Sequence, residues 1–355
     1  MKTLYTISLL LLLFIGTACE RTIDFEGPKE ETANDMVVNA LAVEGGRLTV
    51  FVNRAYLVNQ TPTQYYDYDH AVFARDDMAA DYALPFYGQR TAITNAQVTA
   101  VVNGKDNYEL FFDADELAFQ SDYVPREGDH IVVTAAQGKT LVRAETVVPA
   151  KPKIEILNHE VINENPYSEI NGLLNPAEKI MRLTCRISDA GGKQYYRLRV
   201  RSEVSQTNID LHKDQYSWYV MQDVYFSEDE LFVDHRLTSN FGGWPAYFST
   251  VFDNTLMRGS AYTFSLDALE AMPTLPYRNT DLETKKELVP IPSRVMVELQ
   301  SISPDLYRYL KSVQLYRVAE VDAFSEQVQI YSNAENGWGI LGALSYDRHY
   351  INFED

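Results

Sequence analysis

Three glycines near the C-terminus have the spacing of a dinucleotide-binding motif. The stretch "SNAENGWGILGALS" contains Gly337, Gly339 and Gly342 in the pattern Gly-x-Gly-x-x-Gly. That motif works when a strand leads into the glycine turn and a helix leaves it, so that backbone N–H groups and the helix dipole face the pyrophosphate. A strand-like segment precedes the glycines at residues 327–331, but the residues after them, "ALSYDRHYINFED", are typical of an extended chain. We therefore predict a glycine turn between late strands of a β-domain, and no bound dinucleotide.

Other motifs that could carry chemistry are incomplete. Gly138-Lys139-Thr140 matches the end of a phosphate-binding loop, but Val133 stands where that loop needs its first glycine. No Gly-x-Ser-x-Gly elbow occurs, and the acidic stretches "YYDYDH" and "FDADEL" match solvated turns better than a calcium loop. The six histidines lack zinc-ligand spacing: His70, His130, His159, His212, His235 and His349. The sequence thus predicts no catalytic residue, no metal site and no cofactor.

The N-terminus carries the one residue to which we assign a modification. "MKTLYTISLLLLLFIGTACERTIDFEG" has one Lys, an apolar run, small residues and then Cys19. This layout predicts a lipoprotein signal peptide at residues 1–18, with the Cys19 thiol acylated and membrane-bound. Gly16 replaces the usual Leu of the lipobox, so an ordinary secreted protein with a free Cys19 is the alternative. The polar residues 19–35 are then a flexible tether.

Composition excludes one class of partner and one kind of crosslink. The 355 residues have a formal net charge of −19 and no basic run, so the sequence predicts no nucleic-acid binding. With Cys19 acylated, Cys185 has no cysteine partner in the chain, and we expect it to be a small buried residue of a strand.

The pattern of the folded part is mainly β. Residues 36–148 contain short alternating segments, among them Leu48–Val52 and Val98–Val102, separated by turn signals such as Asn103-Gly104. Their spacing predicts an immunoglobulin-like β-sandwich, followed by a linker at residues 149–153. Residues 154–355 are expected to form a larger β-rich domain with one or two helices.

Within the second region, three elements stand out. "KIMRLTCRISD" and "QYYRLRVRSEV" are predicted to pair as strands around Ala190-Gly191-Gly192, and "SRVMVELQSI" is predicted to be a strand. A helix is expected near 304–317, because Ser303 suits the N-cap, Pro304 the first turn and Asp305 the positive end of the helix dipole. We expect this helix to cover one face of the second sheet.

An unusually long segment interrupts the first sandwich. Residues 60–90 separate two strands and concentrate aromatic rings among carboxylates, a composition that suits binding of a peptide, a carbohydrate or a protein surface. The alternative is an ordered loop whose rings pack on their own domain. A second cluster, in "NFGGWPAYFSTVF", has the same two interpretations. The candidate contacts are Tyr65, Tyr66, Asp67, Tyr68, Asp69, Tyr82, Phe86, Tyr87, Trp244 and Tyr247.

Together these motifs are similar to those of a known family. The matching stretches are the Cys19 segment, "MVVNALAVEG", "NAQVTAVVNG", "YVPREGDHIVVTAAQGKTLVRAETVVP", "SISPDLYRYLKSV" and "FSEQVQIYSNAENGWGILGA". On these, the whole mature chain resembles the domain of unknown function 4249 family, lipoproteins of Bacteroidota. The resemblance implies outer-membrane association, often beside TonB-dependent transporters, no catalytic residues, and a turn role for Gly337, Gly339 and Gly342.

Two functions from different classes follow as expectations. The first is a non-catalytic lipoprotein, lipid-anchored at the outer membrane, that assists a TonB-dependent barrel by capturing a ligand or contacting the barrel. The second is a surface adhesion protein or fimbria-like structural subunit. A third hypothesis is a hydrolase whose site is formed by acidic residues from separate segments, and no sequence feature favours it.

Overall fold

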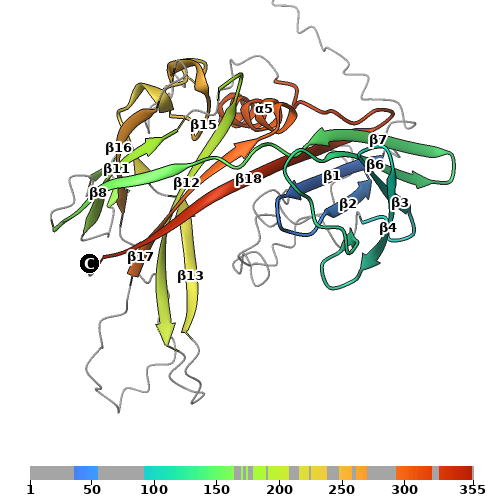
Figure 1. Cartoon of the computed structure of the whole chain (residues 1–355), viewed down its shortest axis with the longest axis horizontal. Coiled ribbons are helices and arrows are strands. Elements are labelled where there is room, and N and C mark those ends of the chain that lie inside the picture. The colour runs from blue at the N-terminus through green and yellow to red at the C-terminus, as the bar shows by residue number, and fades with distance from the viewer. Residues whose placement is uncertain are drawn as a thin grey trace, which may run out of the picture.

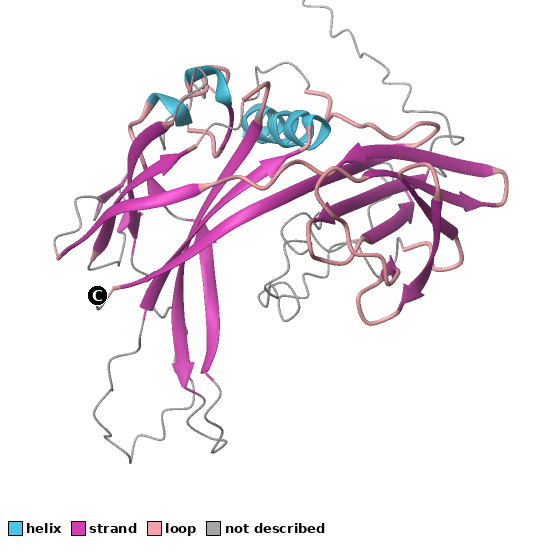
Figure 2. Cartoon of the chain, viewed as in Figure 1, coloured by secondary structure: helices cyan, strands magenta, loops and turns pink. Residues whose placement is uncertain are grey.

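The structure, a computed structural model, describes most of the region predicted to fold. Its described residues are 36–54, 92–163, 169–170, 173–174, 179–188, 191–207, 216–223, 225–237, 248–257, 261–269, 293–321 and 328–353. Over these ranges the chain is mainly β, as predicted, with one α-helix (Figure 2). Two short 3₁₀ helices, η3 (Glu230–Phe232) and η4 (Asn254–Leu256), complete the helical elements of this part of the chain.

The first seven strands confirm the alternation seen in the sequence. Leu48, Val50 and Val52 are buried on one side, as are Val98, Ala100 and Val102. The strands are β1 (Met36–Val43), β2 (Thr49–Arg54), β3 (Gln97–Val102), β4 (Asp106–Asp113), β5 (Ala118–Gln120), β6 (His130–Gln137) and β7 (Thr140–Val147).

The predicted turn between β3 and β4 also forms. Asn103 and Gly104 both have positive φ, 53° and 68°, and the Lys105 N–H donates to the Val102 carbonyl at 3.0 Å, which is the geometry of a type I′ turn. The buried sides of β1 and β2 share one core cluster with those of β3, β6 and β7. The sheet therefore curls around this core, with β1 and β2 on one side and β6 and β7 on the other (Figure 1).

The second region is built from two sheets packed face to face. β11 and β16 lie in a four-stranded sheet of order β14-β16-β11-β8, and β12 and β17 lie in the large sheet. Both sheets bury one side in a shared core cluster. The strands are β8 (Ile154–Ile162), β9 (Glu169–Ile170), β10 (Leu173–Leu174), β11 (Ile180–Ile187), β12 (Tyr195–Thr207), β13 (Tyr216–Asp223), β14 (Tyr225–Phe226), β15 (Val251–Asp253), β16 (Tyr262–Leu269) and β17 (Ser293–Ile302).

One predicted pairing in this region is wrong. The segments "KIMRLTCRISD" and "QYYRLRVRSEV" do form β11 and β12, but these strands do not pair with each other. β11 pairs with β8 and β16, whereas β12 pairs with β13, β15 and β17. Gly191 and Gly192, both with positive φ, lie where the chain passes from one sheet to the other. Cys185 faces the shared core as expected, and burial raises the pKa of its thiol to about 12.

The last strand, β18 (Trp338–Asn352), connects the two regions. Its first half pairs in parallel with β1, from Trp338 opposite Val37 to Leu344 opposite Val43. Its second half pairs antiparallel with β17, from Leu344 opposite Ile302 to Asn352 opposite Arg294. The large sheet therefore runs β13-β12-β17-β18-β1-β2-β5-β4-β3-β6-β7 without interruption (Figure 1). The division into domains at 36–148 and 154–355 stays a prediction.

The segment before β18 differs from the sequence prediction. Residues 328–331, predicted as part of a strand at 327–331, form no strand in the structure. The Tyr331 N–H donates to the Ser312 Oγ at 2.8 Å instead of entering a ladder. Further on, Glu335 bridges to Arg143 of β7, so this segment connects the helix to the edge of the first sheet.

The predicted helix is confirmed as α5 (Pro304–Val321), which runs four residues beyond the expected end at 317. Ser303 caps it: its Oγ accepts a hydrogen bond from the Leu306 N–H at 3.3 Å. Leu306 and Tyr309 are buried in a cluster with Leu41, Ile340 and Leu344. The helix therefore packs over the place where β18 passes from β1 to β17.

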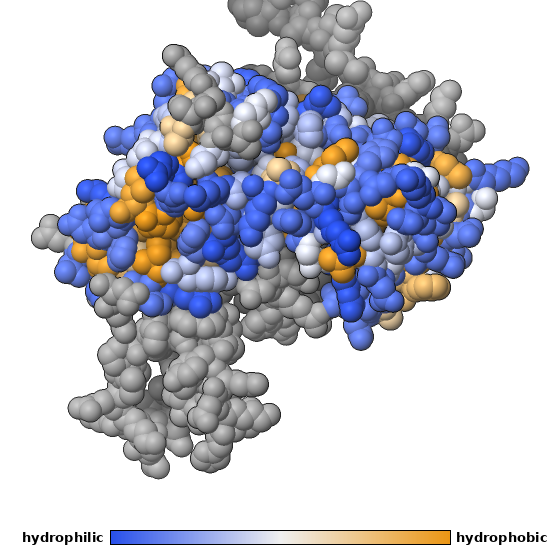
Figure 3. All heavy atoms as spheres, in the orientation of Figure 1, coloured by the Kyte–Doolittle hydropathy of each residue, from blue (hydrophilic) through white to orange (hydrophobic). Residues whose placement is uncertain are grey.

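On the face drawn in Figure 3 hydrophilic residues cover most of the surface, with a hydrophobic group over β8.

Candidate functional site

All residues predicted from the sequence as functional lie outside the described residues. These are Cys19, Tyr65, Tyr66, Asp67, Tyr68, Asp69, Tyr82, Phe86, Tyr87, Trp244 and Tyr247. Phe248, which follows Tyr247, packs with ring centroids 5.2 Å from Tyr225 and 5.6 Å from Phe232. The second aromatic cluster therefore adjoins a core. For the first cluster, the described residues on either side show only where residues 55–91 join the fold.

The flanking residues place both ends of the long segment at one point of the fold. Asn53 and Ala92 form an antiparallel bridge, and the Ile93 N–H donates to the Val52 carbonyl at 2.8 Å. Residues 55–91 thus leave and re-enter the sheet between neighbouring hydrogen-bonded positions. These two contacts fix the positions at which the insertion begins and ends, and they do not depend on its length.

The chain before β1 reaches the same end of the sheet. Met36, the first described residue, pairs with Arg54, and Val37 pairs with Trp338. The segment that leads back to Cys19 and the base of the 55–91 insertion are therefore neighbours on adjacent strands. We call this the exit end: Met36, Val37, Asn53, Arg54, Ala92 and Trp338.

Two of the three glycines lie in β18 at positions where a side chain would not fit. Gly339 has φ +121°, and a Cβ there would lie 2.0 Å from the Val38 carbonyl oxygen. A Cβ at Gly342 would lie 2.9 Å from Leu306 Cδ1 of α5. Both glycines lie within a strand, with no helix after them among residues 343–353. The predicted turn is therefore wrong for Gly339 and Gly342, which lie inside β18. Their lack of a side chain lets β18 lie close to β1 and α5.

A groove opens beside Trp338. It is lined by residues 329–332 with Ala334, Gly337 and Trp338, and its volume is about 430 Å³. The Trp338 side chain is 47% exposed. The Tyr331 hydroxyl donates to Asp305 Oδ1 at 2.6 Å and accepts from Arg308 at 3.2 Å. Burial and this bond to Asp305 raise the pKa of Tyr331. The lining thus mixes the polar Gln329 and Ser332 with aromatic and aliphatic side chains and contains no charged residue, which suits binding better than proton transfer.

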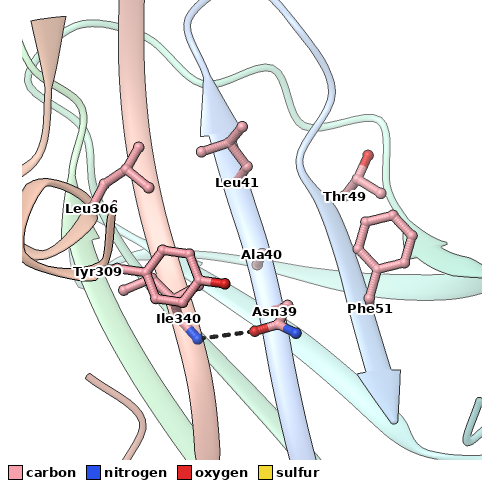
Figure 4. A pocket seen from close by; sticks show the side chains of 8 residues that line it. All are labelled: Asn39, Ala40, Leu41, Thr49, Phe51, Leu306, Tyr309 and Ile340. Atoms are coloured by element: carbon pink, nitrogen blue, oxygen red, sulfur yellow. Dashed lines mark hydrogen bonds between the residues drawn. The ribbon is translucent and has the colours of Figure 1, made fainter. Parts of the chain in front are cut away.

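A smaller cavity lies between α5 and strands β18, β1 and β2. Leu306 and Tyr309 of α5 meet Ile340 of β18 there, above Asn39 and Leu41 of β1 (Figure 4). Its volume of about 30 Å³ holds one water at most. The Asn39 Oδ1 accepts from the Ile340 N–H at 3.2 Å. This cavity is a packing gap at the edge of α5, too small for a ligand.

One buried polar cluster has the residue types of a nucleophile and its base. Lys311 Nζ lies 2.8 Å from Ser249 Oγ and 2.8 Å from Asp234 Oδ2, and Arg236 also binds Asp234. A Ser–Lys pair needs a neutral lysine. Burial lowers the pKa of Lys311, but the Asp234 carboxylate favours its charged form. Ser249 is only 2% exposed, and its hydroxyl donates to the Val251 carbonyl. The cluster therefore joins α5 to the residues just before β15 and just after η3 rather than forming an accessible site.

Two further properties concern only the described residues. No group of three or more His, Cys, Asp or Glu side chains among them could hold a metal ion. No helix in this part of the chain is both long enough and apolar enough to cross a membrane.

Comparison with known proteins gives one decisive match. A family model described as "Domain of unknown function (DUF4249)" matches residues 20–349. The chain belongs to this family. Among solved structures, a crystal structure from Corynebacterium diphtheriae, of a protein called membrane anchored, matches the DUF4249 chain with 9% identity and a TM-score of 0.17. That match covers 76% of this chain and 55% of the other, so this chain spans about half of its length. A comparison with curated proteins gives no match.

Sequence reasoning missed the exit end of this DUF4249 chain. It interpreted the glycines as a turn and did not single out Trp338. The alternation of Trp338, Ile340 and Leu344 was available as a signal for a strand with one apolar side. Nothing local shows that this strand pairs with β1, some 300 residues away, because a parallel partner leaves no turn signature.

Proposed function

We propose that this DUF4249 chain is a membrane-anchored, non-catalytic lipoprotein of the cell envelope that assists a TonB-dependent outer-membrane transporter. The observation that carries the anchoring is Cys19, placed directly after an apolar run and small residues. Two or more acyl chains on such a cysteine would hold the protein on a membrane without a spanning helix.

The geometry of the exit end supports a partner in the same membrane. Residues 55–91 start one position from the strand pair Met36–Arg54, where the chain leading to Cys19 enters the fold. An anchored molecule keeps that end close to the bilayer. The aromatic and acidic side chains of the insertion are then based beside the membrane, where the outer loops of a barrel are in reach.

The anchoring is tested on the full chain by intact mass and by a Cys19→Ala variant. We expect a diacyl or triacyl mass increase on Cys19, and loss of both the mass and the membrane association in C19A. A processed chain with an unmodified thiol at Cys19 would reject the proposal and favour the ordinary secreted protein.

The partnership is tested by native pull-down in mild detergent with a C-terminal tag. The bridge between Asn53 and Ala92 permits a sharp variant, with residues 54–91 replaced by Asn-Gly to close a two-residue hairpin. We expect a TonB-dependent barrel at near-equal amounts with the natural chain and its loss with the shortened one. A second variant keeps the insertion but changes the candidate contacts Tyr65, Tyr66 and Tyr68 to Ser, and loss of the barrel there too would assign the contact to these rings. Recovery of the lipidated chain alone would remove the transporter from the proposal.

A further inference from the structure

The exit end presents a tryptophan that the fold does not use for its cores. Along β18, Trp338, Ile340, Gly342 and Leu344 point to the same side of the sheet. Ile340 and Leu344 belong to the cluster buried beneath α5, whereas none of the described core clusters includes Trp338. The stripe that α5 covers therefore continues past the helix to an indole that is about half exposed.

The surroundings of Trp338 match an interfacial environment. Across the ladder lies Val37, and on its other side opens the groove that contains Ile330 and Tyr331. Arg143 beside the groove pairs with Glu145 at 2.6 Å and with Glu335 at 3.4 Å. Tryptophan is enriched at membrane–water interfaces, because its ring is apolar and its single N–H can donate a hydrogen bond.

The position of the tether decides which surface lies opposite Trp338. Residues 20–35 number 16, from 35 − 19, and they end at Met36, one residue before the Val37–Trp338 pair. A polar chain of 16 residues has a root-mean-square span of about 20–24 Å as a coil. An acylated Cys19 would therefore hold the exit end within about one small-domain diameter of the bilayer, whereas the tether places no such limit on the far end of β18.

We infer that the exit end faces the lipid surface and that Trp338 enters the headgroup region of the anchoring membrane. This inference rests on the proposed acylation of Cys19. It goes further by giving the molecule an orientation: β18 runs away from the membrane, from Trp338 toward Asn352, and carries the α5 region and the second sandwich outward (Figure 1).

The test uses the full lipidated chain in vesicles of phosphatidylethanolamine and phosphatidylglycerol with brominated acyl chains. The sequence holds three tryptophans, Trp218, Trp244 and Trp338. Trp338→Phe keeps an aromatic ring but removes one fluorophore. Any lipid-quenched fluorescence that the natural chain shows and W338F lacks therefore comes from Trp338. We expect brominated lipid to quench this component.

A relocated indole supplies the control. Phe111 is 67% exposed and lies on β4, four strand positions from β18 in the sheet. The double variant W338F/F111W should therefore show no added quenching. Confirmed acylation with an unquenched Trp338, whether a protein partner covers it or it faces water, would overturn the orientation and leave the anchoring intact. Absence of acylation in the mass spectrum would instead overturn both.

Discussion

Gly339 shows how one residue can decide a strand pairing. Alanine there would need φ +121°, a region nearly restricted to glycine, and would press its Cβ against the Val38 carbonyl. We expect Gly339→Ala to destabilise the protein by about 4 kcal/mol or more, measured as a lower midpoint of urea unfolding. Gly128 also has positive φ but has open space around its Cβ position. Gly128→Ala should cost only about 1–2 kcal/mol, and equal losses in the two variants would contradict the role of the close approach.

The Asp234–Lys311 pair makes a second prediction, because its two partners are not equivalent. Asp234→Ala would leave the Lys311 ammonium buried without its carboxylate, which costs about 3–5 kcal/mol. Lys311→Met leaves Asp234 bound to the more exposed Arg236, so it should cost no more than about 1–2 kcal/mol. Thermal unfolding of both variants checks this order, and the reverse order would show that Asp234 depends on Lys311 despite its pair with Arg236.

The same carboxylate predicts a response to acid. Hydrogen bonds from Arg236 and Lys311 hold the pKa of Asp234 well below its usual value. A carboxylate with a lowered native pKa contributes stability at neutral pH, which is lost as the pH falls below about 4 toward the native pKa. Urea midpoints measured between pH 7 and pH 3 should therefore fall more steeply in the natural chain than in Asp234→Asn. Parallel slopes would mean that other carboxylates dominate the acid response.

One hydroxyl links the start of helix α5 to β18. Ser303 Oγ accepts from the Leu306 N–H of the helix and from the Ala343 N–H of the strand, at 3.3 and 3.2 Å. Ser303→Ala leaves both donors without that acceptor and should cost about 1–2 kcal/mol. Hydrogen exchange should become faster at Leu306 and Ala343 in particular, while Ser303→Thr keeps both amides protected. A uniform acceleration along α5 would indicate loss of packing rather than of the cap.

Elements were predictable from the sequence where a local pattern specifies them. Alternation identified β1, β3 and β17, and Ser303-Pro304-Asp305 identified the start of α5. Strand pairing was harder to predict from the sequence. The glycines between β11 and β12 resemble a hairpin turn, but the chain passes there from one sheet to the other. The expected strand at 327–331 failed for a related reason: alternation of Val328 and Ile330 indicates one apolar side, yet no neighbouring strand offers a ladder there. The exit end depends on the β1–β18 register, which no local pattern encodes.

At the scale of the whole chain, β18 makes the two regions depend on each other. Leu341 and Ala343 complete the first core, while Ile351 belongs to the second. The fragment from 154 onward therefore carries a strand that the region 36–148 needs. If each region were an independent domain, a cut in the 149–153 segment would release two folded bodies.

Cleavage at that segment gives the last prediction. A protease site inserted after Lys151, which is exposed, allows the folded chain to be cut while the seven-pair parallel ladder of β1 and β18 stays in place. We expect both fragments to co-elute in gel filtration and to separate only in denaturant, because separation would expose the apolar surface around Leu341 and Ala343. Adding Gly339→Ala, which disturbs that ladder alone, should lower the denaturant concentration needed to part them. Two separate peaks without denaturant would mean that each region folds alone and that β18 only adjoins the first.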